Sequence, residues 1–221
     1  MAAAEREDPL ATLATLSGRG PIYRRVLAPL MMYAGAVGVI SAVLAERQHI
    51  RASGSFALYW LCAAAVVLVG VALLLRLRAW RARQGLVSPQ VRWVFYAVAP
   101  MLVFGVALGV AEILWPQAGD EALFQSRPRP VIARLIASWL LCYGAALDAV
   151  GSVAERGLRV LGWCVLLCGL TLLAAAHLPG IVARLPAPPD RYAHWLMGLC
   201  FGAGHWMYGL YLYFTEEPEA T

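Results

Sequence analysis

The chain has 221 residues, of which 61% are hydrophobic and only 14% are charged. An ordinary soluble domain has about 45–50% apolar and about 25% charged residues, so this composition excludes a soluble protein of this size. The formal net charge of +5 rests on 18 arginines, because the chain has no lysine. No basic run approaches a nucleic-acid-binding patch, so the positive charge indicates membrane topology and no nucleic-acid partner.

A polar tail occupies residues 1–25. Within it, Asp8 is a candidate N-cap and Pro9 suits the first helical position, with leucines following at helical spacing. This pattern predicts a short interfacial helix on the cytoplasmic face, and a tail without fixed structure is the alternative. Because the tail is much longer than the charged segment of a signal peptide, we expect the first apolar helix to stay as an anchor.

Six apolar blocks follow the tail, each close to the about 20 residues that a helix needs to cross a bilayer. We predict transmembrane helices at residues 26–45, 56–75, 94–114, 131–149, 158–178 and 192–214. The predicted fold class is therefore all-α, a polytopic membrane bundle of six transmembrane helices over residues 26–214. An acidic tail at residues 215–221 completes the chain.

The even number of predicted spans puts both termini on one side of the membrane, and the arginines indicate which side. Eleven arginines fall on the side of the termini: Arg6, Arg19, Arg24, Arg25, Arg76, Arg78, Arg81, Arg83, Arg92, Arg156 and Arg159. Six fall on the opposite side: Arg47, Arg51, Arg127, Arg129, Arg184 and Arg191. By the positive-inside rule both termini are predicted to be cytoplasmic, in a bacterial inner membrane.

The two halves of the chain resemble each other. Residues 25–47 align without gaps with residues 134–156, and seven positions are identical, Gly35 and Gly144 among them. A real duplication would make two three-helix repeats of opposite orientation, an arrangement that recurs in transporters. Shared composition, rich in small residues, explains the same matches, and both interpretations stay open.

Small residues and cysteines both indicate a tightly packed bundle. Gly105 and Gly109 form one small-xxx-small face and Gly198 and Gly202 form another, which predicts close helix packing. All five cysteines fall within predicted helices, without the close grouping of thiolates and imidazoles that zinc requires. We therefore expect the cysteines to pack as apolar residues and predict no metal site from them.

Three segments resemble a known family: "GPIYRRVLAPLMMYAGAVGVISAVLA", "ASWLLCYGAALDAVGS" and "GLCFGAGHWMYGLYLYF". They look like an uncharacterised family of six-helix bacterial inner-membrane proteins, whose members carry a Trp-Leu-Leu-x-Tyr-Gly-Ala-like fourth helix and end in a Phe-Gly-x-x-His-like segment. The chain departs from that pattern at Cys142 and Tyr143 and at the glycine before His205. The resemblance implies architecture and no chemistry.

Four ionisable groups of the predicted spans share one level near the outer interface: Glu112, Arg134, His177 and His194. Ionisable groups in a membrane are candidates for function. One interpretation is interfacial, with Glu112 and Arg134 as a structural ion pair and the histidines meeting headgroups or water. The other is an outward-facing site, in which His177 and His194 bind a metal or a haem iron.

Asp148 and His205 are the two deepest ionisable groups, about 25 Å and about 20 Å below the outer starts of their helices at 1.5 Å per residue. We predict that His205 points into the bundle and bonds Asp148 directly or through water, as a proton-holding couple. The alternative is a neutral imidazole bonded to a carbonyl or hydroxyl group, with Asp148 facing Arg156 and Arg159.

No phosphate-binding loop, zinc-protease pair or nucleophile elbow occurs, so the sequence offers no catalytic residue. The favoured hypothesis is a non-catalytic membrane component that acts through lipids or partner proteins, including a second copy of itself. A small proton-coupled transporter is the alternative, suggested by the repeat with Asp148 and His205. A haem-binding electron carrier is a second alternative, and no cofactor is otherwise expected.

Overall fold

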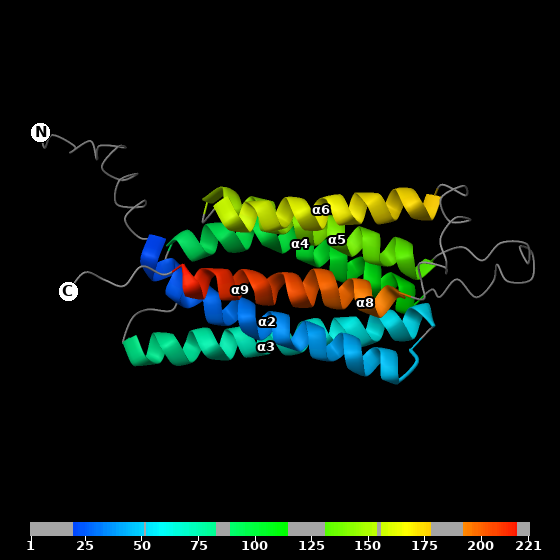
Figure 1. Ribbon diagram of the computed structural model, residues 1–221, viewed down its shortest axis with the longest axis horizontal. Coiled ribbons are helices and arrows are strands. Elements are labelled where there is room, and N and C mark those ends of the chain that lie inside the picture. Colours follow the sequence, from blue (N-terminus) through cyan, green and yellow to red (C-terminus); the bar gives the residue numbers. More distant parts are fainter. Residues whose placement is uncertain are drawn as a thin grey trace, which may run out of the picture.

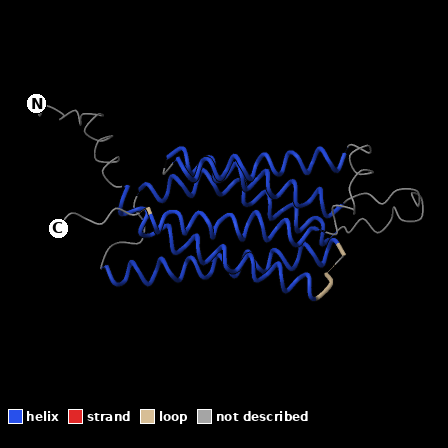
Figure 2. Tube along the Cα trace, in the orientation of Figure 1, coloured by secondary structure: helices blue, strands red, loops and turns tan. Residues whose placement is uncertain are grey.

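A computed structural model of the protein describes residues 20–50, 52–82, 89–114, 131–153, 156–177 and 192–215. These ranges contain helices and short turns and no strand, which confirms the all-α fold class (Figure 2). The interfacial helix predicted near Asp8 and the acidic tail after Thr215 lie outside the described residues. The division of the chain into tails and helical domain stays a prediction.

The described residues form six helical stretches, which lie side by side along the long axis of the bundle (Figure 1). The first five are α2 (Gly20–Arg47), α3 (Ser53–Ala82), α4 (Pro89–Leu114), α5 (Val131–Val153) and α6 (Arg156–His177). The sixth consists of three consecutive elements, α8 (Ala193–Met197), η2 (Gly198–Ala203) and α9 (Gly204–Phe214). Most helices extend past the predicted spans, because the flanking arginines and polar residues also favour helix.

Four of these helices, α2, α3, α5 and α6, are long and apolar enough to cross a membrane. The apolar section of α4 is shorter and covers Val98–Leu114. The protein is therefore a multi-pass helical membrane protein, in contact with the lipid bilayer.

Helix α5 lies at the centre of the bundle. In its apolar window 56% of the residues are buried, against 6% in α3. Its apolar positions face several neighbours at once, since α5 packs against α4 on one side and α6 on the other. The side chains of α3 instead point outward along most of its length, where lipid replaces protein.

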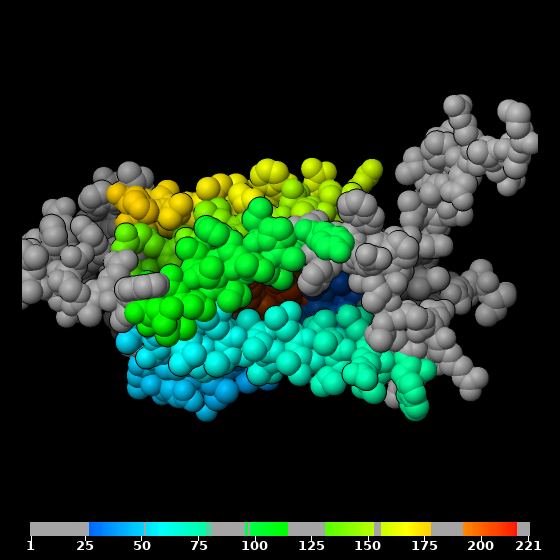
Figure 3. Space-filling model, turned by 180° about the vertical axis from the view of Figure 1, so that it is seen from behind, coloured from blue at the N-terminus to red at the C-terminus, as the bar shows by residue number. Residues whose placement is uncertain are grey.

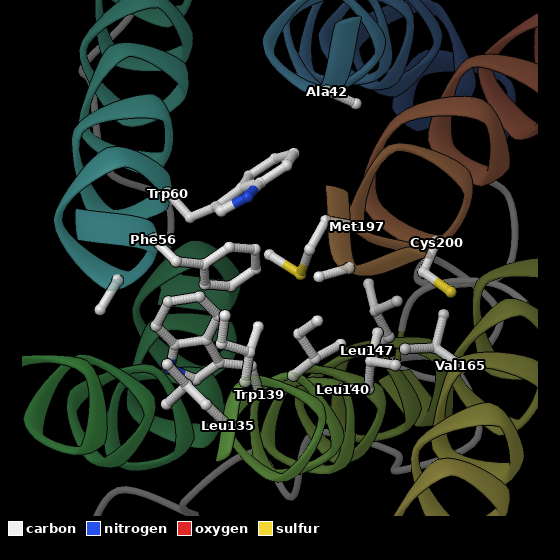
Figure 4. Close-up of a cluster of buried hydrophobic side chains, with 14 of the residues drawn as sticks. Ala42, Phe56, Trp60, Leu135, Trp139, Leu140, Leu147, Val165, Met197 and Cys200 are labelled. Atoms are coloured by element: carbon white, nitrogen blue, oxygen red, sulfur yellow. The ribbon is translucent and has the colours of Figure 1, made fainter. Parts of the chain in front are cut away.

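A cluster of buried apolar side chains joins the helices of the bundle (Figure 4). Met197 from α8 extends toward Phe56 of α3, and Trp139 of α5 stacks on the same phenylalanine at a ring distance of 6.3 Å. Phe56 and Leu140 are fully buried. The flexible methionine and the aromatic rings thus fill the space between α3, α5 and α8.

Glycines let α2 pack directly on the C-terminal helical stretch. A β-carbon built at Gly38 would lie 2.8 Å from the Cα of Gly202, and one built at Gly202 would lie 2.7 Å from the backbone nitrogen of Val39. Such close approach is possible only without side chains at the crossing. The small-residue face predicted around Gly198 and Gly202 is therefore a packing face against α2.

A second glycine-lined crossing joins α5 and α6. A β-carbon at Gly144 would lie 2.7 Å from the backbone nitrogen of Leu166, and one at Gly162 would lie 2.7 Å from that of Asp148.

The glycines Gly105 and Gly109 of α4 make room for a side chain of α5 instead of a helix backbone. The indole of Trp139 lies against both glycines and donates its N–H to the carbonyl of Gly105 at 2.8 Å.

Seen from behind, α3 and α4 meet near one end of the bundle and diverge toward the other (Figure 3). Atoms of α2 and of the C-terminal stretch are visible in the hollow between them. Tyr33 joins α2 to α3, because it contacts Gly70 and donates a hydrogen bond from its hydroxyl to the carbonyl of Val66 at 3.2 Å. The bundle therefore has a shallow lateral hollow on its membrane-facing side.

The α5–α6 crossing yields the first prediction. Gly144→Ala places a β-carbon against the backbone of α6, which cannot rotate away as a side chain would, so the helices must separate. We expect a loss of about 1–3 kcal/mol in the free energy of unfolding, measured by denaturant titration in mixed micelles. Gly54→Ala is the control: its nearest atoms would lie 3.8 Å away, so only the gain in helix propensity, about 1 kcal/mol, should remain. Equal stability of the two variants would contradict this packing.

Candidate functional site

His194 is buried, with 1% of its surface exposed, in an aromatic cage at one end of the bundle. Its ring centre lies 5.0 Å from that of Phe56 and 6.4 Å from those of Tyr59 and Trp60. The cage comes from the first two turns of α3, and His194 comes from the start of α8. The residue therefore joins the C-terminal stretch to α3.

Both ring nitrogens of His194 are hydrogen-bonded. The indole N–H of Trp60 donates to Nδ1 at 3.3 Å, and Nε2 lies 2.8 Å from the carbonyl oxygen of Ile50. Because Nδ1 accepts the hydrogen bond from Trp60, Nε2 must carry the ring proton and donate a hydrogen bond to the carbonyl of Ile50. His194 is therefore the neutral Nε2–H tautomer, and it has no lone pair left for a metal.

The turn after α2 presents the carbonyl of Ile50 to this histidine. The N–H of His49 bonds to the carbonyl of Glu46 and the N–H of Ile50 to that of Ala45, which together form a Schellman motif. His49 has a φ of 53°, the left-handed conformation that the motif requires after the last helical residue. The last carbonyls of α2 are therefore hydrogen-bonded within the turn, and the carbonyl of Ile50 faces His194 of α8.

His205 is the second buried histidine, with 2% of its surface exposed, and its partner is Tyr143. Its Nε2 lies 2.6 Å from the hydroxyl oxygen of Tyr143 on α5. The ring of Phe201 packs against Tyr143 at 4.9 Å. On the other side of the imidazole, Nδ1 is shielded from solvent and makes no hydrogen bond of full geometry in the described part of the chain, although the ring lies beside the backbone of Cys200 and Phe201. Tyr143 and His205 therefore form one polar contact between α5 and α9.

The helix segment before His205 is a π-helix, η2, which spans Gly198–Ala203. Its turns are wider than those of an α-helix, and such segments often occur next to functional groups. Gly198 and Gly202 offset the extra width, because they let η2 stay in contact with α2. The irregular segment thus places His205 toward α5 while the helix remains packed on α2.

Asp148 does not contact His205 directly. Its Oδ1 accepts a hydrogen bond from Nε of Arg159 at 3.0 Å, in an ion pair across the α5–α6 turn that is exposed on both sides. The alternative interpretation named these contacts, a hydroxyl group on the imidazole of His205 and Arg159 beside Asp148. A water-bridged couple of His205 and Asp148 stays a prediction.

Glu112 and Arg134 line one pocket between α4 and α5. The pocket has a volume of about 390 Å³, and Ser138 adds a hydroxyl group to its wall. Oε1 of Glu112 and Nη2 of Arg134 are shielded from solvent without a hydrogen-bond partner. No ion pair joins the two residues among the described contacts. They share the level expected from the sequence, and their charge compensation stays a prediction.

The structure does not bring the candidate haem ligands together. His177 is exposed at the end of α6 and contacts the carbonyl of Leu173 in its own helix at 2.9 Å. Both ring nitrogens of His194 are occupied by Trp60 and Ile50. The described residues contain no group of three or more histidine, cysteine or acidic side chains that could hold a metal ion.

All five cysteines are free, and the sulfur atoms of Cys168 and Cys200 lie 3.6 Å apart.

Sequence reasoning missed the two partners of the buried histidines. Tyr143 lies 12 residues after the start of α5, or about 18 Å at helical rise, which matches the depth of about 20 Å expected for His205 better than Asp148 does. That signal was present in the sequence. The hydrogen bond from Trp60 to His194 could not be predicted from the sequence, because it depends on the rotation of α3 about its own axis.

Comparisons of the chain with protein-family models, with curated proteins and with solved structures give no match. No family is identified, and the resemblance to six-helix inner-membrane proteins stays an expectation.

The cage around His194 yields the second prediction. His194→Phe keeps a ring in the cage but leaves the Trp60 N–H and the Ile50 carbonyl without a partner. Each buried group left unpaired costs about 1–3 kcal/mol, so the variant should unfold at a clearly lower denaturant concentration. His177→Phe is the matched control, and because that histidine is exposed, its effect should stay within about 0.5 kcal/mol. Equal effects of the two substitutions would rule out the cage as a structural element.

Proposed function

We propose that the chain crosses the membrane six times, with both termini on the cytoplasmic side of a bacterial inner membrane. Two features support the additional spans. Residues 193–214 form an unbroken helical stretch of 22 residues, or about 33 Å at helical rise, against a hydrocarbon core of about 30 Å. The apolar section of α4 lies in a helix of 26 residues. The excess of arginines on the side of the termini supports the orientation.

The orientation yields the third prediction, for cysteine labelling in a cysteine-free background. Arg78→Cys should react with a membrane-impermeant maleimide only after the cells are opened. Ala52→Cys, exposed in the turn between α2 and α3, should react in intact cells. The opposite pattern would invert the topology.

The inverted repeat receives little support from the packing. The aligned glycines Gly35 and Gly144 both lie at close crossings, but Gly35 meets Trp206 of α9 and Gly144 meets Leu166 of α6. In a three-plus-three inverted repeat, α9 is the counterpart of α4 and α6 is the counterpart of α3. Gly144 would then have to meet α4, as Gly35 meets α9, so the two glycines do not make equivalent contacts. A transporter mechanism that depends on this symmetry is not proposed.

We further propose that the protein is a non-catalytic membrane component that acts through the lipids around it. One observation carries this function: the polar side chains inside the bundle serve packing, while the unpartnered charges lie together at a helix end. His194, Trp139 and Tyr59 each bond across helices to protein groups. Glu112 and Arg134 instead face a pocket within a turn of the ends of α4 and α5. That level is where lipid headgroups meet a transmembrane helix.

A proton-coupled carrier is the second candidate, and the contact between Tyr143 and His205 favours it. Either group can donate in this hydrogen bond, and the imidazole can take the proton on either nitrogen. The pair lies beside the π-helix, the least regular segment of the bundle. Groups that exchange a proton next to such a segment suit coupled movement across the membrane.

Reconstitution separates the two functions and yields the fourth prediction. Native mass spectrometry of the protein released from liposomes should show phospholipid that stays bound after excess detergent has removed the bulk lipid. Liposomes with a trapped pH-sensitive dye should show no proton flux above that of empty liposomes. Bare protein in the spectra would overturn the lipid function.

A proton flux would instead support the carrier, provided that it depends on the right residues. Tyr143→Phe and His205→Gln should then abolish it. Tyr59→Phe, which removes a comparable hydroxyl bonded to the carbonyl of Ser41 at 2.7 Å, should leave it unchanged. A flux that is the same in all three variants would exclude the Tyr143–His205 pair as the carrier.

A further inference from the structure

The pocket between α4 and α5 combines opposite charges with an apolar wall. Its polar lining consists of Glu112 from α4 and of Arg134 and Ser138 from α5. Leu108 and Leu135 contribute apolar surface below them. The volume of about 390 Å³ falls within the range of roughly 300–1,000 Å³ that is typical of small-molecule sites.

The two charged side chains lie at the height of the membrane interface. Glu112 lies two residues before the end of α4 at Leu114, and Arg134 lies three residues after the start of α5 at Val131. At helical rise these offsets are about 3 Å and about 4.5 Å. A ligand that binds here therefore meets the polar groups with its head and the apolar lining with whatever chain it carries.

Both charged groups lack partners at the atoms that the protein shields. Oε1 of Glu112 and Nη2 of Arg134 are buried without a hydrogen bond. A buried charge is retained when a group of opposite charge offsets its desolvation. Because the two side chains do not pair with each other in the described contacts, each calls for a separate complementary group on the ligand.

We propose that this pocket binds a zwitterionic phosphoethanolamine group, with the phosphate on Arg134 and the primary ammonium on Glu112. A guanidinium donates two parallel hydrogen bonds to phosphate oxygens. A carboxylate accepts hydrogen bonds from a primary ammonium, which a trimethylated ammonium cannot donate. A purely anionic headgroup would place its charge beside Glu112 without compensation. The hydroxyl of Ser138, one turn after Arg134, adds a third contact to the phosphate.

This inference rests on the proposed action through lipids and names the headgroup class, and it yields the fifth prediction. The protein is reconstituted in vesicles with equal parts of phosphatidylethanolamine, phosphatidylcholine and phosphatidylglycerol, and the retained lipid is identified by native mass spectrometry. We expect about tenfold or greater enrichment of phosphatidylethanolamine over the other two, because each lost charge-assisted hydrogen bond weakens binding by at least that factor.

Two variants distinguish the roles of the charged groups. Glu112→Gln removes the partner of the ammonium but keeps the size of the side chain, so it should abolish the preference and retain phosphatidylglycerol at least as well. Arg134→Gln removes the partner of the phosphate and should reduce retention of all three lipids. Arg159→Gln, in the exposed pair at the other end of α5, is the control and should keep the pattern of the unmodified protein. If Arg134→Gln does not fold, Glu112→Gln alone still decides the matter.

A soluble competitor identifies the source of the headgroup. If glycerophosphoethanolamine displaces the bound lipid at equal concentration, the pocket takes the free zwitterion as well. If it does not, the acyl chains contribute and the ligand is the lipid. Both results support the pocket chemistry. Equal retention of the three lipids by the unmodified protein, or an unchanged preference in Glu112→Gln, would overturn it. Tightly bound lipid without any headgroup preference would leave the proposed function standing and refute only this inference.

Discussion

Close approach of helix backbones at glycine is the constraint on which this bundle depends. Lipid removes the usual hydrophobic drive between helices, so contact area must supply the attraction. The crossing at Gly38 and Gly202 joins α2 to the C-terminal stretch, and the crossing at Gly144 and Gly162 joins α6 to α5. Further glycines extend both crossings, Gly35 and Gly209 between α2 and α9 and Gly151 and Gly169 between α5 and α6. The glycine crossings therefore determine which polar groups face each other across the middle of the bundle.

The two buried histidines differ in the hydrogen-bond partners that the helix packing gives them. His194 meets a donor on one nitrogen and an acceptor on the other, which fixes its tautomer and leaves it no further chemistry. His205 bonds the hydroxyl of Tyr143 through Nε2, and its other nitrogen makes no hydrogen bond of full geometry in the described residues. The first stabilises the end of the bundle. The second joins α9 to α5 inside the bundle.

Charges follow a similar division between the two ends of α5. Asp148 and Arg159 pair with each other in an exposed position near the end at Val153. Glu112 and Arg134, at the opposite end, turn to a common pocket instead of pairing. An exposed pair contributes little, since water already solvates both groups. Shielded and separated charges cost more to keep, so the pocket is the part of the molecule where binding a ligand gains the most.

The sequence by itself determined the all-α class, the places of the described helices and the position of each ionisable group along its helix, because apolar run length and helical rise are local properties. It also indicated that Gly198 and Gly202 form a packing face, since small residues four positions apart lie on one side of a helix and allow another helix to approach closely. Only the tertiary structure decided that Tyr143 faces His205, that Trp60 donates to His194 and that Asp148 pairs with Arg159. These contacts depend on the rotation of each helix about its axis and on the extra width of the π-helix. Both are set by the packing of neighbouring helices. Residue spacing gives the position of a side chain along its helix, but not which neighbouring helix that side chain faces.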